Sequence, residues 1–381
     1  MIHKKLWRCA LVAALTWAAC SVGATDGVEP RQLLIGQSIA LQGGRNDYAA
    51  AVMDGVRAYL EKTNAEGGVH GRQIALRTLD DDNSGAQAEA NARRLVQQDK
   101  VFLLFGSIEG GPSSGVLQAA SELKVPFIGP MAGTPTLREP FQPMVFPVRA
   151  EHKDEFRAIL EMARGTGVRR VGFMRTDSEV GLLHLRNVKA LCHTLGMEFV
   201  ADLPFQSNLS DARIAAMAQT LAQSQTQLVL NHGSIGAYEK LIRQARAQGL
   251  RVTFSAVNSG STELARHLGE LAHGMVMSQV LPSPFERRTP IAREYQDDFA
   301  RRLPGKPFSY GSLEGYLSAK ALVEALRLAG PQPTREGLVG AIESAGSLNL
   351  SGLRNSYGAT RHQGMSLVEL AIVTRDGKFL H

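Results

Sequence analysis

A glycine- and serine-rich stretch, Gly106-Ser-Ile-Glu-Gly-Gly-Pro-Ser-Ser-Gly115, carries the clearest chemistry of the chain. It follows an apolar run predicted to be a buried strand, and it opens a segment predicted to be helical. The first N–H groups of a helix have no partner within the helix and lie at the positive end of its dipole, so they can bind a carboxylate. We therefore predict that Gly110, Gly111 and Ser113 hold an anionic group. The alternative is a tight turn with a serine helix cap.

The same residues match the G-x-S-x-G pattern of serine hydrolases, with Ser113 as the nucleophile. Such an enzyme also needs a histidine and an acid later in the chain. Among the later histidines, we find no recognisable triad context for His193, His232 or His273. Pro112 before the serine favours the start of a helix over a strained turn. We therefore expect no enzymatic activity and keep an exported hydrolase as a minor alternative.

Metal-ligand patterns are weak in this sequence. The acidic run Asp80-Asp-Asp82 lacks the loop spacing and the closing glutamate of a calcium site. No group of cysteines and histidines shows the spacing of metal ligands along the chain. We expect neither a metal ion nor a cofactor.

The N-terminus has the three parts of an export signal. Lys4, Lys5 and Arg8 precede an apolar run from Cys9 to Cys20, and the small residues Val22-Gly-Ala24 follow. The run is too short to cross a bilayer, which takes about 20 apolar residues. We expect residues 1–24 to be a signal peptide and the mature protein to be periplasmic. Lipoprotein anchoring at Cys20 is a less favoured alternative.

Charge and cysteine content restrict the remaining function classes. Removal of residues 1–24 deletes three basic residues and no acid, so the formal charge falls from +6 by three to +3. This mild charge, without a block of Lys and Arg, argues against nucleic acid as a partner. Cys192 is then the one remaining cysteine, so we expect a buried thiol and no internal disulfide.

Strand-like and helix-like segments alternate along two halves of the chain. The first set runs from Gln32–Ser38 to Val125–Ile128, and the second from Arg170–Met174 to Val252–Ser255. This pattern predicts an α/β fold with two doubly wound parallel-sheet lobes joined by a multi-strand hinge. We assign residues 28–148 and 283–348 to lobe 1, and residues 149–282 and 349–381 to lobe 2. A ligand would bind in the cleft at the carboxyl ends of the strands.

Several motifs occur in the order found in one family: Ile35-Gly-Gln-Ser38, Asn64-Ala-Glu-Gly-Gly-Val-His-Gly71, Val125-Pro-Phe-Ile-Gly-Pro130, Ile242-Arg-Gln-Ala-Arg-Ala-Gln-Gly249 and Ser312-Leu-Glu-Gly-Tyr316. Over nearly the whole mature chain, the sequence resembles the periplasmic solute-binding proteins of branched-chain amino-acid-type ABC transporters, which are Leu/Ile/Val-binding-protein-like and have the type 1 periplasmic-binding-protein fold. The resemblance implies a monomer that closes on a small molecule and delivers it to an inner-membrane permease. A ligand-sensing receptor of the same fold is the alternative.

The resemblance also implies binding residues in both lobes. In the first lobe they are Gln37, Ser38, Ala132, Thr134 and Tyr310, with Tyr48 as a further candidate. In the second lobe they are His152, Val180 and Ser234, with His232 as an alternative to Ser234. Val180 lies where many relatives place an aromatic residue over the ligand. His152 could instead be an exposed helix-cap residue.

Asn258 is the most informative departure from the family pattern. Amino-acid-binding relatives have a glutamate at about this place, where it pairs with the ammonium group of the ligand. A buried ammonium without a counter-charge costs several kcal/mol. We therefore expect a small polar carboxylate, an amino-acid-like solute or its deaminated analogue, and the loss of the acid favours the solute without an ammonium group.

Overall fold

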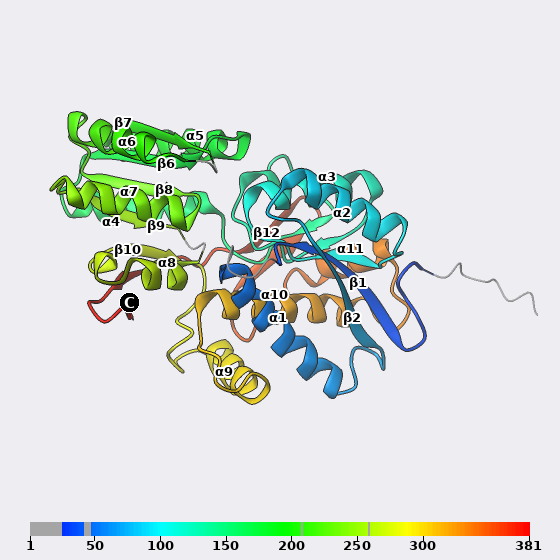
Figure 1. Ribbon diagram of the computed structural model, residues 1–381. Helices are drawn as coiled ribbons and strands as arrows, with labels where there is room; N and C mark the ends of the chain where they lie inside the picture. The colour runs from blue at the N-terminus through cyan, green and yellow to red at the C-terminus, as the bar shows by residue number, and fades with distance from the viewer. Residues whose placement is uncertain (1–24, 42–46, 207–208, 258–259) are drawn as a thin grey trace, which may run out of the picture.

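The computed structural model describes residues 25–41, 47–206, 209–257 and 260–381, which form two α/β lobes (Figure 1). Each lobe is built on its own sheet of mainly parallel strands with helices on both faces. This confirms the predicted fold class. No helix in these described ranges could span a bilayer.

The first lobe has a five-stranded parallel sheet in the order β2-β1-β3-β4-β5. Its strands are β1 (Gln32–Ile39), β2 (Gln73–Asp80), β3 (Leu103–Phe105), β4 (Phe127–Ile128) and β5 (Val145–Phe146). One face packs on α2 (Gly85–Gln97) and α3 (Gly110–Leu123). The other packs on α1 (Asp47–Ala65), α9 (Pro290–Arg302), α10 (Tyr310–Leu328) and α11 (Arg335–Ala345). A short 3-10 helix, η1, spans Pro135–Leu137.

The second lobe has a seven-stranded sheet in the order β14-β13-β10-β9-β8-β6-β7. Five parallel strands form most of it: β6 (Arg170–Thr176), β7 (Glu198–Phe205), β8 (Leu228–His232), β9 (Thr253–Ala256) and β10 (Val276–Gln279). β13 (Glu369–Val373) and β14 (Phe379–Leu380) extend it as antiparallel strands. Its helices are α4 (His152–Gly165), α5 (Glu179–Thr194), α6 (Asp211–Gln223), α7 (Ile235–Ala247), α8 (Ser261–Leu268) and the 3-10 helix η2 (Gly269–Ala272).

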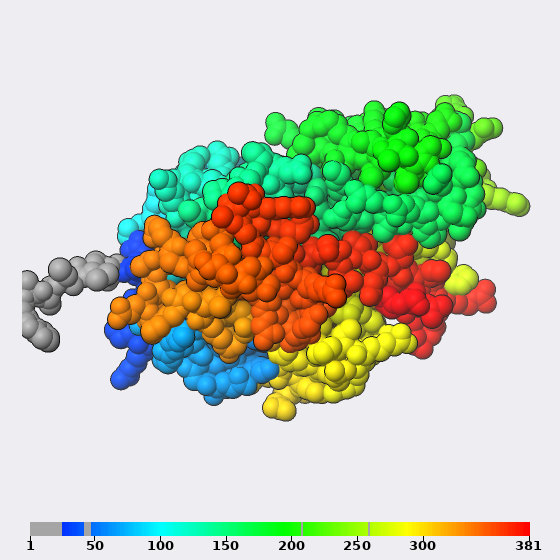
Figure 2. All heavy atoms as spheres, turned by 180° about the vertical axis from the view of Figure 1, so that it is seen from behind, coloured from blue at the N-terminus to red at the C-terminus, as the bar shows by residue number. Residues whose placement is uncertain are grey.

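The chain crosses between the lobes after β5, after β10 and before β13, so the connection has several strands as expected. Seen from behind, the C-terminal part of the chain runs from the first lobe across to the second (Figure 2). Both lobes are therefore completed by segments distant in sequence.

One predicted boundary places a segment in the wrong lobe. We expected residues 349–381 in the second lobe, but the hairpin of β11 (Asn355–Gly358) and β12 (Arg361–Met365) packs on the first. Tyr357 and Met365 join the first core, and the Tyr357 hydroxyl donates to the Pro147 carbonyl at 3.0 Å. The hairpin has few apolar residues, so its sequence does not indicate which core it completes.

Helices α1 and α10 pack so closely that glycines are required where they cross. A Cβ atom on Gly315 would lie 2.0 Å from the Val52 carbonyl oxygen, and one on Gly55 would lie 1.8 Å from the Ser312 carbonyl oxygen. Both contacts are with backbone, which cannot move aside without separating the helices. This packing fixes the start of α10 against the start of α1, where the first lobe faces the second.

We predict that Gly315→Ala lowers the free energy of unfolding by about 1–3 kcal/mol or more, because it overpacks this crossing. The matched control is Gly340→Ala in α11, where an added Cβ meets nothing within 4 Å. That change should stabilise the protein by about 0.5–1 kcal/mol, since alanine favours the helix interior. Thermal melting of both variants tests this, and equal melting temperatures would contradict it.

Candidate functional site

The lobes face each other through the carboxyl ends of their parallel strands and the helix starts that follow, which we call the interlobe surface. In the first lobe it comprises the starts of α1 and α3 and the loop 129–134. In the second lobe it comprises the starts of α4, α5 and α8 and the end of β8. Ligands bind at this edge of doubly wound sheets.

The two halves of the interlobe surface touch. A Cβ atom on Gly110 of the first lobe would lie 2.8 Å from Cγ1 of Val180 in the second. Nearer to solvent, Arg266 Nη2 lies 2.7 Å from Asp47 Oδ2 across the same boundary. The structure therefore shows the lobes in a closed arrangement.

The predicted anion site lies at the start of α3. Gly110 is buried opposite Val180, whereas Gly111 is exposed, so only the first of these glycines faces the other lobe. Ser113 is buried, and its hydroxyl lies 2.6 Å from the Ser107 hydroxyl. Glu109, directly before the helix, has a φ of 63°, and burial raises the pKa of its carboxyl although Arg149 opposes this.

The loop 129–134 contributes backbone more than side chains. Ala132 is buried in the core beneath α3, and the Thr134 hydroxyl lies 3.2 Å from the Thr136 hydroxyl. Gly133 lies directly against His152 of the second lobe: its N–H donates to His152 Nε2 at 3.3 Å, and its carbonyl accepts from the His152 N–H at 2.9 Å. His152 is thus a buried residue at the interlobe surface and not an exposed cap.

Gln37 and Ser38 point in opposite directions because neighbouring residues on a strand alternate between its faces. Ser38 turns into the first lobe, where its hydroxyl donates to Asp81 Oδ2 at 3.2 Å and accepts from Asn91 Nδ2 at 3.2 Å. Gln37 accepts from the Thr78 hydroxyl at 3.2 Å, and its Nε2 has no partner among the described residues. Of this pair, Gln37 is the one with a group left to bind a ligand.

The remaining predicted residues do not form one cluster. Ser234 is an exposed N-cap of α7, and its hydroxyl accepts from the Ala237 N–H at 3.4 Å. Tyr310 is buried, but its hydroxyl lies 2.6 Å from Nε2 of His381 at the C-terminus. Asn258 lies outside the described residues.

A buried charge network, missed by the sequence analysis, joins the two lobes around Arg149. Its guanidinium lies 2.5 Å from Glu155 Oε1 on α4 and 3.5 Å from Glu314 Oε1 on α10. Glu314 also accepts a 2.8 Å hydrogen bond from the Tyr48 hydroxyl, and Glu155 accepts one of 2.6 Å from Ser278. Burial works against the charge of Arg149, but the two glutamates hold the pKa of its guanidinium above the ordinary value.

Buried polar atoms without a hydrogen-bond partner among the described residues lie at or near the interlobe surface. They are at the carboxyl ends of strands or in the helices that follow: Gln37 Nε2, both ring nitrogens of His184, Asn231 Oδ1, His232 Nδ1, Glu263 Oε2 and Gln279 Nε2. An unsatisfied buried polar atom costs about 1–3 kcal/mol. Other such atoms lie elsewhere, for example Asp99 Oδ2 and Arg302 Nε, so it is the grouping of polar atoms near the interlobe surface that makes this region a candidate for ligand contact.

Glu263 changes the electrostatic argument made from Asn258. It lies in the first turn of α8, is buried, and is near Gly260, which faces Tyr48 of the first lobe. Burial raises the pKa of this carboxyl, so its surroundings disfavour its charged form. A positively charged group beside it would remove that cost.

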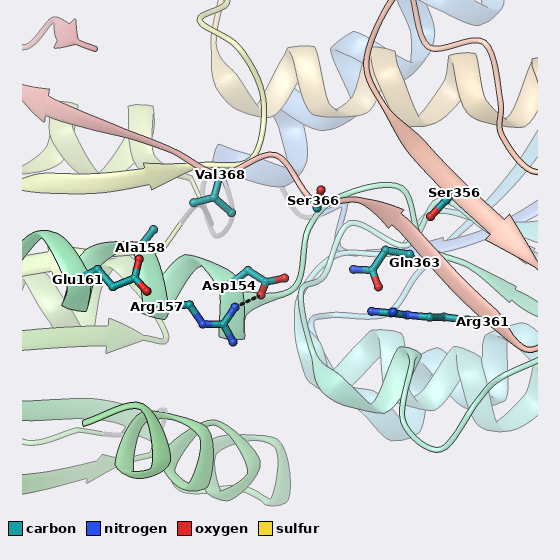
Figure 3. Close-up of a pocket in the computed structure, with 9 residues that line it drawn as sticks. All are labelled: Asp154, Arg157, Ala158, Glu161, Ser356, Arg361, Gln363, Ser366 and Val368. Atoms are coloured by element: carbon teal, nitrogen blue, oxygen red, sulfur yellow. Dashed lines mark hydrogen bonds and ion pairs between the residues drawn. The ribbon is translucent and has the colours of Figure 1, made fainter. Parts of the chain in front are cut away.

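A separate hollow of about 500 Å³ lies on the hinge side, between α4 and the hairpin β11–β12 (Figure 3). Its lining includes Asp154, Arg157, Glu161 and Arg361, and Asp154 and Arg157 pair with each other at 3.1 Å. None of the predicted binding residues that the structure describes lines it. We therefore keep the interlobe surface as the candidate functional site.

We predict that Arg149→Met lowers the free energy of unfolding by about 3–5 kcal/mol, because it leaves Glu155 and Glu314 buried without their counter-charge. The control is Arg157→Met, which removes an exposed pair with Asp154 and should cost at most about 1 kcal/mol. Chemical denaturation of the two variants tests this. A cost for Arg149→Met as small as for the control would show that the network does not carry stability.

Comparison with known proteins agrees with this architecture. Residues 32–378 match the family model described as "Periplasmic binding protein". Among curated proteins, the chain is 24% identical over 293 residues to "Leu/Ile/Val-binding protein homolog 7" of Brucella abortus, covering 71% of each chain.

Two solved structures show the same fold. A possible leucine/isoleucine/valine-binding protein from Rhodopirellula baltica superposes with a TM-score of 0.84 at 25% identity, covering 94% of this chain and 98% of that one. A branched-chain amino acid ABC transporter protein from Thermus thermophilus with bound valine superposes with a TM-score of 0.81 at 20% identity, covering 92% and 95%. Since the family model spans nearly all of the described residues, this chain belongs to the periplasmic binding protein family.

Proposed function

We propose that this protein is the exported solute-binding component of an ABC-type importer and that it closes its two lobes over a small amino-acid-like solute. The observation that carries the proposal is the set of buried, unpartnered polar groups at the interlobe surface. The close approach of Gly110 to Val180 supports a mechanism in which groups from both lobes reach the solute only when the lobes meet.

The distribution of charge favours a solute with both a carboxylate and an ammonium group. The start of α3 offers backbone N–H groups to the carboxylate. Glu263 supplies an acid with one unpartnered oxygen, which the argument from Asn258 alone had lacked. The guanidinium of Arg149 is already paired with the buried acids Glu155 and Glu314. Glu263 is therefore the buried acid left for an ammonium group. A zwitterionic solute would place its carboxylate at the start of α3 and its ammonium group beside Glu263.

The first test is a thermal-shift screen of the purified chain against branched-chain and aromatic amino acids, their deaminated acids, short dicarboxylates and amides. A solute at 100 times its Kd should stabilise the closed protein by about 2.7 kcal/mol. We expect an α-amino acid to give the largest shift. Largest shifts from the deaminated acids would restore the conclusion drawn from Asn258, and no shift from any compound would contradict the proposal.

Glu263→Gln separates these possibilities. The change keeps the side-chain shape but removes the charge, so it should weaken binding of an amino acid at least tenfold while leaving any deaminated acid unaffected. The control is Glu239→Gln, an acid on α7 that pairs with Arg243 at 2.8 Å on the surface. That variant should bind every solute as the parent protein does.

Closure itself is tested by Gly110→Ala. Its added Cβ would lie 2.8 Å from Val180 Cγ1, so the closed form should be disfavoured and the affinity for the solute found in the screen should fall at least tenfold. Gly111→Ala is the neighbouring control, since its Cβ meets nothing within 4 Å. Affinity is measured by isothermal titration calorimetry.

The double variant Gly110→Ala/Val180→Ala removes the clash and should regain most of the lost affinity. If it binds no better than Gly110→Ala alone, the glycine acts on the solute directly and not through closure. If Gly110→Ala and Gly111→Ala bind alike, the contact across the lobes does not control affinity.

A further inference from the structure

Three histidines from separate elements meet inside the second lobe, next to the interlobe surface. His152 begins α4, His184 lies in α5, and His232 ends β8. Their ring centroids are 3.9 Å apart for His184 and His232, 4.7 Å for His152 and His232, and 5.3 Å for His152 and His184. One nitrogen from each ring can be chosen so that all lie within 4.8 Å of one another.

All three imidazoles are at least nine-tenths buried, with exposed fractions of 3%, 0% and 7% for His152, His184 and His232. Three ring nitrogens have no hydrogen-bond partner among the described residues: Nδ1 and Nε2 of His184 and Nδ1 of His232. Buried polar groups are otherwise hydrogen-bonded in folded proteins. The protein thus buries three nitrogens of His184 and His232 without supplying a partner from its own described atoms.

His152 is oriented by a carboxylate behind it. Its Nδ1 lies 2.8 Å from Glu155 Oε1, and the same carboxylate is held by Arg149 and by the Ser278 hydroxyl. A histidine whose Nδ1–H donates to a carboxylate has a more basic Nε2, and this arrangement is common behind metal-binding histidines. Within the described residues, the one hydrogen bond to His152 Nε2 comes from the Gly133 N–H, and it is long at 3.3 Å.

The rings are neutral in this environment, which is the form that binds metal ions. Burial lowers the pKa of all three imidazoles, to about 4 for His232. Phe156 packs on this cluster, with its centroid 5.7 Å from that of His184, and Phe173 packs behind Phe156 at 5.4 Å. The surroundings therefore exclude water from one side of the histidines.

We propose that His152, His184 and His232 form a binding site for a divalent transition-metal ion of the zinc class, with one nitrogen of each ring as a ligand. Imidazole nitrogens suit Zn²⁺, Ni²⁺ and Cu²⁺, whereas Mg²⁺ and Ca²⁺ prefer oxygen. Zn–N bonds of about 2.0–2.1 Å place tetrahedral ligands about 3.4 Å apart. The nitrogens now lie within 4.8 Å of one another, so they must approach by up to about 1.4 Å. The nearest acid to the site is Glu155, 2.8 Å from His152 Nδ1, and it offsets the positive charge of Arg149.

This site goes beyond the proposed solute-binding function, and it differs from what the sequence predicts. Along the chain, 32 residues separate His152 from His184 and 48 separate His184 from His232. Metal motifs read from sequence rely on ligands a few residues apart, so no such pattern marks this set. Three protein ligands leave a fourth position open to water or another oxygen ligand.

The test is equilibrium dialysis of the chain, purified without a histidine tag, against Zn²⁺, with bound metal measured by mass spectrometry. We expect one equivalent of tightly bound Zn²⁺, and visible d–d absorption typical of a tetrahedral site when Co²⁺ replaces it. His184→Leu should weaken Zn²⁺ binding at least 100-fold and abolish the Co²⁺ spectrum. His193→Leu, on the exposed side of the same helix, should leave both unchanged.

His232→Gln serves as a second variant, and circular dichroism establishes that each protein is folded. No stoichiometric Zn²⁺ in the parent protein, or the same Zn²⁺ content in His184→Leu and His232→Gln as in His193→Leu, would overturn the proposal. The solute screen is independent of this result. A protein that binds an amino acid but no metal refutes only the metal site, and one that binds metal but no solute refutes only the solute proposal.

Discussion

The buried guanidinium of Arg149 is the constraint on which the closed structure depends. It lies where the chain first leaves the first lobe, and it contacts an acid on each side: Glu314 on α10 and Glu155 on α4. Buried charges are tolerated only when they are paired and hydrogen-bonded, so the three groups fix one another in position. The tight glycine crossing of α1 and α10 serves the same arrangement, because it sets the position of Glu314 and of its partner Tyr48.

The interlobe surface follows a different rule from the rest of the protein. Within each lobe the sheets are covered by apolar cores, whereas several of the buried polar atoms without a partner among the described residues lie where the lobes meet. In the proposed function, a solute supplies the missing hydrogen-bond partners and so stabilises the closed form, which would make closure dependent on binding.

The sequence predicted the fold well because its evidence is local. Alternating strands and helices, and glycine-rich turns between them, depend on neighbouring residues and specify two parallel-sheet lobes. The site was predicted only in part. Gly110, Gln37 and His152 lie at the interlobe surface, whereas Ser38 turns inward by strand alternation and Ser234 caps a helix at the surface. Strand periodicity alone could have separated Gln37 from Ser38.

Other site residues could not be found by spacing along the chain. Arg149, Glu155 and Glu314 come together through tertiary packing across two lobes, and no local pattern joins positions 149 and 314. His184 did carry a signal, because it shares the buried helical face of Leu185, Val188 and Leu191. A buried histidine needs a hydrogen-bond or metal partner. The helical pattern could therefore single out His184, but it could not identify His152 and His232 as its neighbours.

Both carboxylate oxygens of Glu155 are used in contacts within the protein, so this acid differs from those that could contact a ligand. Oε1 contacts Arg149 and His152, and Oε2 accepts from Ser278, so the acid with the most central position is already fully engaged. It can orient other groups but has little capacity left for an occupant. The capacity lies instead with Glu263, with the amides of Gln37, Asn231 and Gln279, and with the imidazole nitrogens. The network around Arg149 therefore joins the two lobes, and the proposed function assigns recognition of the solute to the unpartnered groups.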